Sequence, residues 1–213
     1  MIQPGRRKGE AALFKAAGAG GISLLFFLGL FLCTPRLVCA GLALLPAQER
    51  EVRSYLRNNF EQALEEECFV DDLLAYLRHK IPGAPEHFSP ALMAYYGALQ
   101  GLKAKYSALP AQKLHYLKVC LKYLDQAVQS PGADLETYFL RFSSLHHLPP
   151  FFDIPKKRSE DIQMICRLLE KRDYSVLDRE FQLKVVDFML QSRRLNAQQT
   201  KELSVFKSAL AGF

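Results

Sequence analysis

The repeated helical spacing of apolar residues is the feature that most constrains this fold. Apolar side chains recur at intervals of three and four residues in successive segments, and proline or glycine separates these segments. This spacing places apolar side chains on one face of a helix, whereas a half-buried strand alternates them with polar ones. No alternating run is convincing enough to indicate a strand. The sequence therefore predicts an all-α fold.

The proline and glycine breaks predict about eight helices, packed as antiparallel pairs in a bundle or a short array. The expected starts are residue 47, residue 60, where the second segment either continues or restarts the first helix, Pro90 after its cap Ser89, the segment after Pro110, Asp134, and the residues following the caps Ser159, Ser175 and Asn196. A stripe of small residues that lets another backbone approach closely comprises Ala94, Gly97, Gly101, Ala104 and Ala108. A narrow apolar seam, typical of antiparallel packing, comprises Leu114, Leu117, Leu121, Leu124 and Val128.

The first forty residues have the pattern of an export signal. Basic residues precede the twelve-residue apolar stretch 22–33, which the sequence Thr-Pro-Arg at 34–36 interrupts. Val38 and Ala40 then allow cleavage before Gly41. We therefore predict a signal peptide or membrane anchor over residues 1–40, followed by a single helical domain over residues 41–213.

Two other interpretations of this terminus stay open. Residues 16–35 are uncharged and just long enough to span a bilayer without cleavage. Lipidation at Cys39 or Cys33 is the third interpretation, although Val38 and Leu32 fit poorly before a lipidated cysteine. All three predict an exported domain, either periplasmic or anchored with residues 41–213 outside the cytoplasm. The membrane is a direct partner if the segment is not cleaved.

Charge and cysteine content narrow the classes of function. The net charge is +6, but +4 of it lies within residues 1–40. The nearly neutral remainder gives no reason to expect nucleic acid, whose binding depends on phosphate neutralisation. The domain has three widely spaced cysteines, Cys68, Cys120 and Cys166, which is not a disulfide framework. We interpret them as small buried residues, and the sequence does not decide whether any two form a disulfide.

No motif in the sequence predicts catalytic residues, a metal site or a cofactor. The five histidines lack the spacing of metal ligands and are interpreted as surface or satisfied residues: His79, His87, His115, His146 and His147. The acidic residues between 65 and 72 are interpreted as a solvated helix face. No nucleophile motif and no glycine-rich phosphate loop occurs in the predicted domain. We therefore expect a protein that is not an enzyme.

Lysines and tyrosines interleave along the predicted third and fourth helices. The candidate binding surface for an acidic peptide or glycan comprises Tyr95, Tyr96, Lys103, Lys105 and Lys113. In the alternative interpretation, the lysines cover the solvent face and the tyrosines pack beneath them. Arg141 lies in an apolar segment and is expected to be a buried structural charge, paired with Glu136 or Asp125. The basic run 156–158 is expected in a solvated loop.

The segment from Tyr95 to Phe152 resembles a family of uncharacterised exported bacterial helical proteins. It carries that family's G-A-x-x-x-x-K-A-K, K-L-x-Y and L-R-F pattern at residues 97–105, 113–116 and 140–142. Residues 112–145 also resemble a tetratricopeptide helical pair, although Pro131 comes one residue early and no 34-residue period recurs. The first resemblance implies an exported helical protein but no particular activity.

Two classes of function remain after these exclusions, beside a third hypothesis, a purely structural subunit of a larger envelope assembly. The favoured hypothesis is a bacterial cell-envelope protein that binds or scaffolds another protein or a peptide without catalysis. The alternative is an envelope hydrolase acting on cell-wall or lipid material, which requires a pocket with convergent polar groups.

Overall fold

The computed structural model describes residues 46–148 and 154–211. Within them the structure is all-α, as the spacing predicts, and contains no strand. Its elements are α1 (Pro46–Glu65), α2 (Glu67–Lys80), the short 3-10 helix η1 (Pro85–His87), α3 (Pro90–Tyr106), α4 (Pro110–Gln129), α5 (Leu135–His146), α6 (Ile154–Glu170), α7 (Arg179–Gln191) and α8 (Ala197–Ala211). The export segment and its predicted cleavage site at Ala40 and Gly41 lie outside the described residues.

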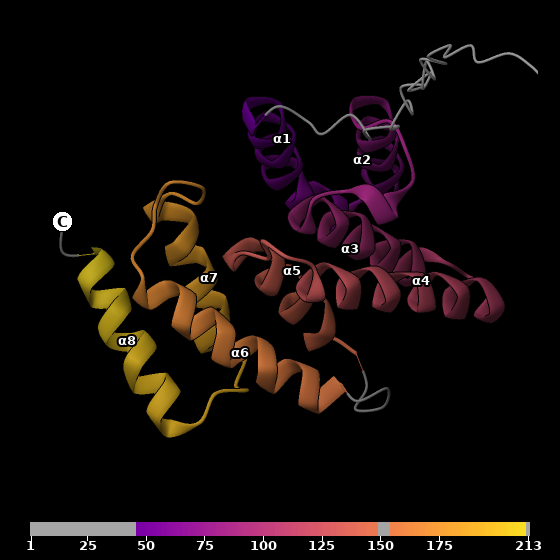
Figure 1. Ribbon diagram of the computed structural model, residues 1–213. Coiled ribbons are helices and arrows are strands. Elements are labelled where there is room, and N and C mark those ends of the chain that lie inside the picture. The colour runs from indigo at the N-terminus through magenta and orange to yellow at the C-terminus, as the bar shows by residue number, and fades with distance from the viewer. Residues whose placement is uncertain (1–45, 149–153, 212–213) are drawn as a thin grey trace, which may run out of the picture. The chain divides into compact units, whose positions relative to one another are not determined.

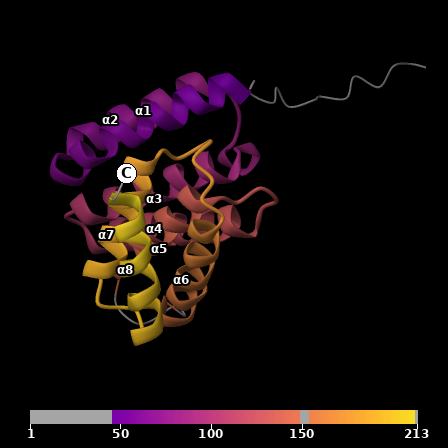
Figure 2. The same ribbon diagram turned by 90° about the vertical axis from the view of Figure 1, so that its left-hand side faces the viewer.

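Successive helices form antiparallel pairs around two separate hydrophobic clusters. The pairs in contact are α1 with α2, α3 with α4, α5 with α6, and α7 with α8. The first cluster draws on α1–α4 and the second on α5–α8. Helix α5 contributes residues to both clusters, because Leu140 belongs to the first cluster and Phe142 to the second. Figure 1 shows α5 between α3 and α6, and Figure 2 shows α7 and α8 side by side.

The small residues of α3 allow α4 to approach closely, as predicted. A Cβ atom built on Gly97 would lie 3.1 Å from the backbone nitrogen of Leu124, and one built on Gly101 would lie 3.0 Å from Cys120 Sγ. The predicted seam of α4 is wrong in its register. Only Leu124 of that seam is buried, whereas Leu114 is exposed. The face of α4 that packs inward comprises Cys120, Tyr123, Leu124 and Ala127.

Two predicted helix caps are wrong, and of the two alternatives left open at residue 60 the helix continues. The first helix continues to Glu65, and the extended backbone of Glu66 separates it from α2. Helix α6 begins at Ile154, so Ser159 lies inside the helix and caps nothing. Asp178, not Ser175, caps α7, because its Oδ1 accepts the backbone N–H of Phe181 at 2.8 Å.

The predicted cap of the last helix is confirmed. Asn196 Oδ1 accepts the backbone N–H of Gln199 at 2.8 Å, and Gln199 Oε1 accepts that of Asn196 at 3.0 Å. Among the described helices, none is both long enough and apolar enough to cross a membrane.

Candidate functional site

A buried carboxylate joins the two halves of the fold. Glu136, in the first turn of α5, is completely buried. Its Oε1 accepts hydrogen bonds from Arg57 Nε at 2.7 Å and from the Tyr95 hydroxyl at 2.7 Å. Its Oε2 accepts from Arg53 Nε at 2.8 Å. Because these partners come from α1 and α3, the Glu136 network holds α5 against the first hydrophobic cluster.

In the Glu136 network, the buried carboxylate of Glu136 is paired with the guanidinium groups of Arg53 and Arg57 and bonded to the Tyr95 hydroxyl. This pairing of opposite charges indicates a structural role. Burial lowers the pKa of Arg53, but Glu136 and Asp134 outweigh it and hold that pKa above its ordinary value. Burial and the Glu136 charge raise the pKa of the Tyr95 hydroxyl well above its ordinary value. Tyr95 therefore does not belong to a surface, which corrects its inclusion in the candidate binding surface.

Arg141 is buried, and two carboxylates accept hydrogen bonds from it. Asp125 Oδ1 lies 3.1 Å from its Nη1, which is one of the two partners expected from the sequence. The other expected partner, Glu136, binds Arg53 and Arg57 instead. The main partner is Asp161 of α6, whose Oδ1 accepts from Nη2 at 2.7 Å and from Nε at 2.9 Å.

Sequence reasoning missed Asp161 because α6 starts earlier than predicted. With a start after Ser159, Asp161 would lie in the first helical turn, where an acidic side chain offsets the positive end of the helix dipole. With the actual start at Ile154, it lies in the third turn and faces α5. Burial raises the pKa of Asp161 to about 7, against the opposing effect of Arg141.

The remaining residues of the predicted binding surface have mostly local partners. Lys103 Nζ lies 2.7 Å from Asp71 Oδ1, and Lys105 Nζ donates to the carbonyl oxygen of Leu64 at 2.6 Å. The ring of Tyr96 packs between those of Phe88 and Tyr123. Lys113 is exposed, and among the described residues no side chain or backbone oxygen accepts a hydrogen bond from its ammonium group. These contacts fit lysines that cover the surface and tyrosines that pack beneath them.

The basic run at 156–158 is not in a loop. It lies in the first turns of α6, where Lys157 Nζ contacts Asp125 Oδ2 at 2.6 Å. Arg158 is buried and donates to the carbonyl oxygens of Leu145 and His146 at 3.4 and 3.5 Å, at the end of α5. A basic side chain at a helix C-terminus offsets the negative end of the helix dipole. This run therefore connects α6 to α4 and α5.

The histidines and acidic side chains of the described residues do not converge on one another. No histidine there forms an ion pair with a carboxylate, and no group of three metal-ligating side chains converges. His115 stacks edge-on against Tyr116, and His146 packs against Phe142 and Phe188. The acidic residues Glu67 and Asp71 are exposed on α2.

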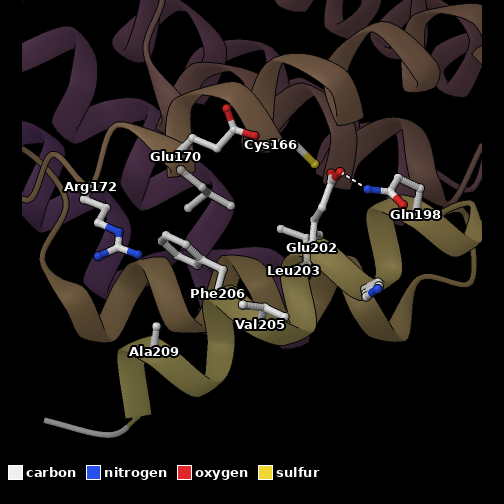
Figure 3. A pocket seen from close by; sticks show the side chains of 11 residues that line it. Cys166, Glu170, Arg172, Gln198, Glu202, Leu203, Val205, Phe206 and Ala209 are labelled. Atoms are coloured by element: carbon white, nitrogen blue, oxygen red, sulfur yellow. Dashed lines mark hydrogen bonds between the residues drawn. The ribbon is translucent and has the colours of Figure 1, made fainter.

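A groove lies between α6 and α8 in the described surface, hereafter the α6/α8 groove. It has a volume of about 360 Å³. Its apolar lining comprises Cys166 and Leu169 from α6 and Leu203, Val205, Phe206 and Ala209 from α8. Figure 3 shows Phe206 pointing from α8 toward α6, with Cys166 and Glu170 on the facing side.

The α6/α8 groove is open because α8 packs mainly on α7 and not on α6. Val205 leaves 64% of its surface exposed, the largest exposed fraction among the large hydrophobic residues of the described chain. Acidic residues at the rim, Glu170 and Glu202, are accompanied by the basic residues Arg172 and Lys201. The spacing of apolar residues does not predict this groove, because the groove depends on the position of α8 relative to α6, and α7 separates these two helices in the sequence.

Comparison with known proteins finds no matching family model, no matching curated protein and no matching solved structure.

Proposed function

We propose that this chain is a non-catalytic binding module of the bacterial cell envelope, and that the α6/α8 groove receives an amphipathic helix of a partner protein. The observation that carries the proposal is the exposed apolar lining of the groove. Val205 and Phe206 stand at its mouth, and Leu169 and Leu203 are buried beneath. Exposed apolar surface bordered by charged residues is typical of interaction sites.

A helix is the occupant that this lining favours. Two helices border the groove, and an inserted helix would present apolar side chains at intervals of three and four to both of them. The rim carries both signs of charge, with Glu170 and Arg172 on the α6 side and Lys201 and Glu202 on the α8 side. A helix with acidic and basic residues beside its apolar face would find partners on each side.

Export of the module is the second part of the proposal. The basic residues and the apolar stretch 22–33 support a signal peptide or an anchor, with the domain outside the cytoplasm. The antiparallel helix pairs support a tetratricopeptide-like arrangement as the finer description of the fold.

Methyl NMR spectra of the full chain test the groove. The probe is a short synthetic helix with leucines at intervals of three and four and with lysine and glutamate elsewhere. We expect saturable shifts at the methyl groups of Val205, Leu203 and Leu169. Val205→Asp should weaken binding by about tenfold or more, because it places a charge in an apolar contact.

The matched control is Val176→Asp, the same substitution at an exposed valine outside the groove. It should leave binding unchanged. A scrambled peptide of the same composition should not bind. Equal binding of the two peptides, or shifts confined to methyl groups outside the groove, would contradict the proposal.

A further inference from the structure

The α3–α4 hairpin carries an unusually one-sided charge. Residues 87–124 contain five lysines and no aspartate or glutamate. Carboxylates from elsewhere neutralise two of these lysines, because Lys103 pairs with Asp71 and Lys122 with Glu86. The other three, Lys105, Lys113 and Lys118, form no ion pair with a carboxylate of the described chain. Positive charge therefore remains at the end of the hairpin where α3 turns into α4.

Exposed leucines gather at the same end. Leu109 in the turn is 58% exposed, and Leu114 in the first turns of α4 is 45% exposed. Lys105 Nζ and the Tyr106 hydroxyl donate to the carbonyl oxygen of Leu64 at 2.6 and 2.7 Å, which brings the end of α1 to the end of α3. Leu64 is itself 39% exposed. None of these leucines belongs to either hydrophobic cluster.

These residues form one surface, hereafter the hairpin tip: Leu64, Leu109, Leu114, Lys105, Lys113 and Lys118. Lys118 lies one helical turn beyond Leu114 and therefore on the same face of α4. A lysine stem can lie along apolar surface while its ammonium group stays in a polar layer. The hairpin tip thus combines protruding apolar side chains with a border of cations.

We propose that the hairpin tip docks on a lipid surface rich in anionic headgroups. The leucines would enter the boundary between headgroups and acyl chains, and the lysines would contact lipid phosphates. The composition of the tip favours lipid over a protein partner. Lysine is depleted at protein interfaces, and leucine is under-represented among the residues that dominate their affinity.

The test uses the full chain on vesicles of phosphatidylglycerol or of phosphatidylcholine. A nitroxide is attached at Leu109→Cys after Cys33, Cys39, Cys68 and Cys166 are changed to serine; Cys120 is buried and stays. A matched label at Gln163→Cys reports on an exposed position of α6. We expect collisions with lipid-soluble oxygen to rise at residue 109 on phosphatidylglycerol only, and to stay low at residue 163.

Charge variants separate the tip from any contribution of the apolar segment 22–33. Lys113→Gln with Lys118→Gln should lower the equilibrium constant for tip insertion by about 30-fold, because each lysine near an anionic surface contributes a factor of about five. The control pair, Lys156→Gln with Lys171→Gln, removes equal charge elsewhere and should have no effect.

Three results would overturn the proposal. The first is a label at residue 109 that remains as accessible to water as the label at residue 163 on phosphatidylglycerol. The second is equal insertion into both vesicle types. The third is shielding of residue 109 by an acidic protein of the cell in the absence of vesicles, which would assign the tip to a protein partner.

Discussion

Glu136 is the residue on which the junction between the two hydrophobic clusters depends most. We predict that Glu136→Gln lowers the free energy of unfolding by roughly 3–5 kcal/mol, because it leaves the buried Arg53 and the half-buried Arg57 without their main counter-charge. Denaturant titration measures this change. Asp71→Asn makes the same chemical change in an exposed pair with Lys103, and should alter stability by less than about 1 kcal/mol. Equal effects of the two substitutions would show that the Glu136 network does not stabilise the fold.

The sequence predicts the burial of Arg141 but not the identity of its main partner. An arginine between two phenylalanines needs a carboxylate, and Asp125 supplies one as expected. Glu136 and Asp161 could not be assigned in the same way, because pairing across helices depends on helix starts and rotations. An error of six residues in the start of α6 was enough to place Asp161 in the first helical turn instead of opposite Arg141.

The two glycines of α3 differ in what limits the approach of α4. We predict that Gly101→Ala destabilises the protein by about 1–3 kcal/mol, because the new Cβ would lie 3.0 Å from Cys120 Sγ. Cys120→Ala removes that sulfur and should largely relieve the cost of Gly101→Ala. Gly97→Ala should not be relieved, because its Cβ would meet the backbone of α4 at Leu124 and Cys120.

A double-mutant cycle in denaturant measures the coupling between positions 101 and 120 and, as the control, between 97 and 120. Additive effects at positions 101 and 120 would contradict the contact that the structure assigns to Gly101.

The helical spacing of apolar residues predicts the number and order of the described helices well. It predicts less well which face of each helix is buried. The small stripe of α3 identified a helix that packs closely on its neighbour. The leucines of α4 were assigned to the interior because of their spacing, yet Leu114 is exposed and the face shifts toward Cys120 and Tyr123. Spacing identifies a candidate apolar face, but the partner helix decides which side of it is covered. The uncovered leucine is part of the hairpin tip.

At the scale of the whole molecule, the candidate binding surfaces lie in different halves of the fold. The α6/α8 groove belongs to the second hydrophobic cluster, and the hairpin tip borders the first. The sequence predicted a surface of lysines and tyrosines, of which Tyr95 proved buried and Lys103 paired. The groove could not be predicted, because it arises where α8 packs on α7 and leaves α6 uncovered.

Photo-crosslinking from Val205 is the most direct test of the proposed function. The photoreactive residue benzoylphenylalanine is placed at position 205 in cells that produce this protein. It should give one discrete adduct, and the crosslinked peptide of the partner should have apolar residues at intervals of three and four. The same group at Gln163, an exposed position of α6 outside the groove, should give no such adduct. Identical products from both positions, or no product from residue 205, would contradict the claim that the α6/α8 groove binds a partner helix.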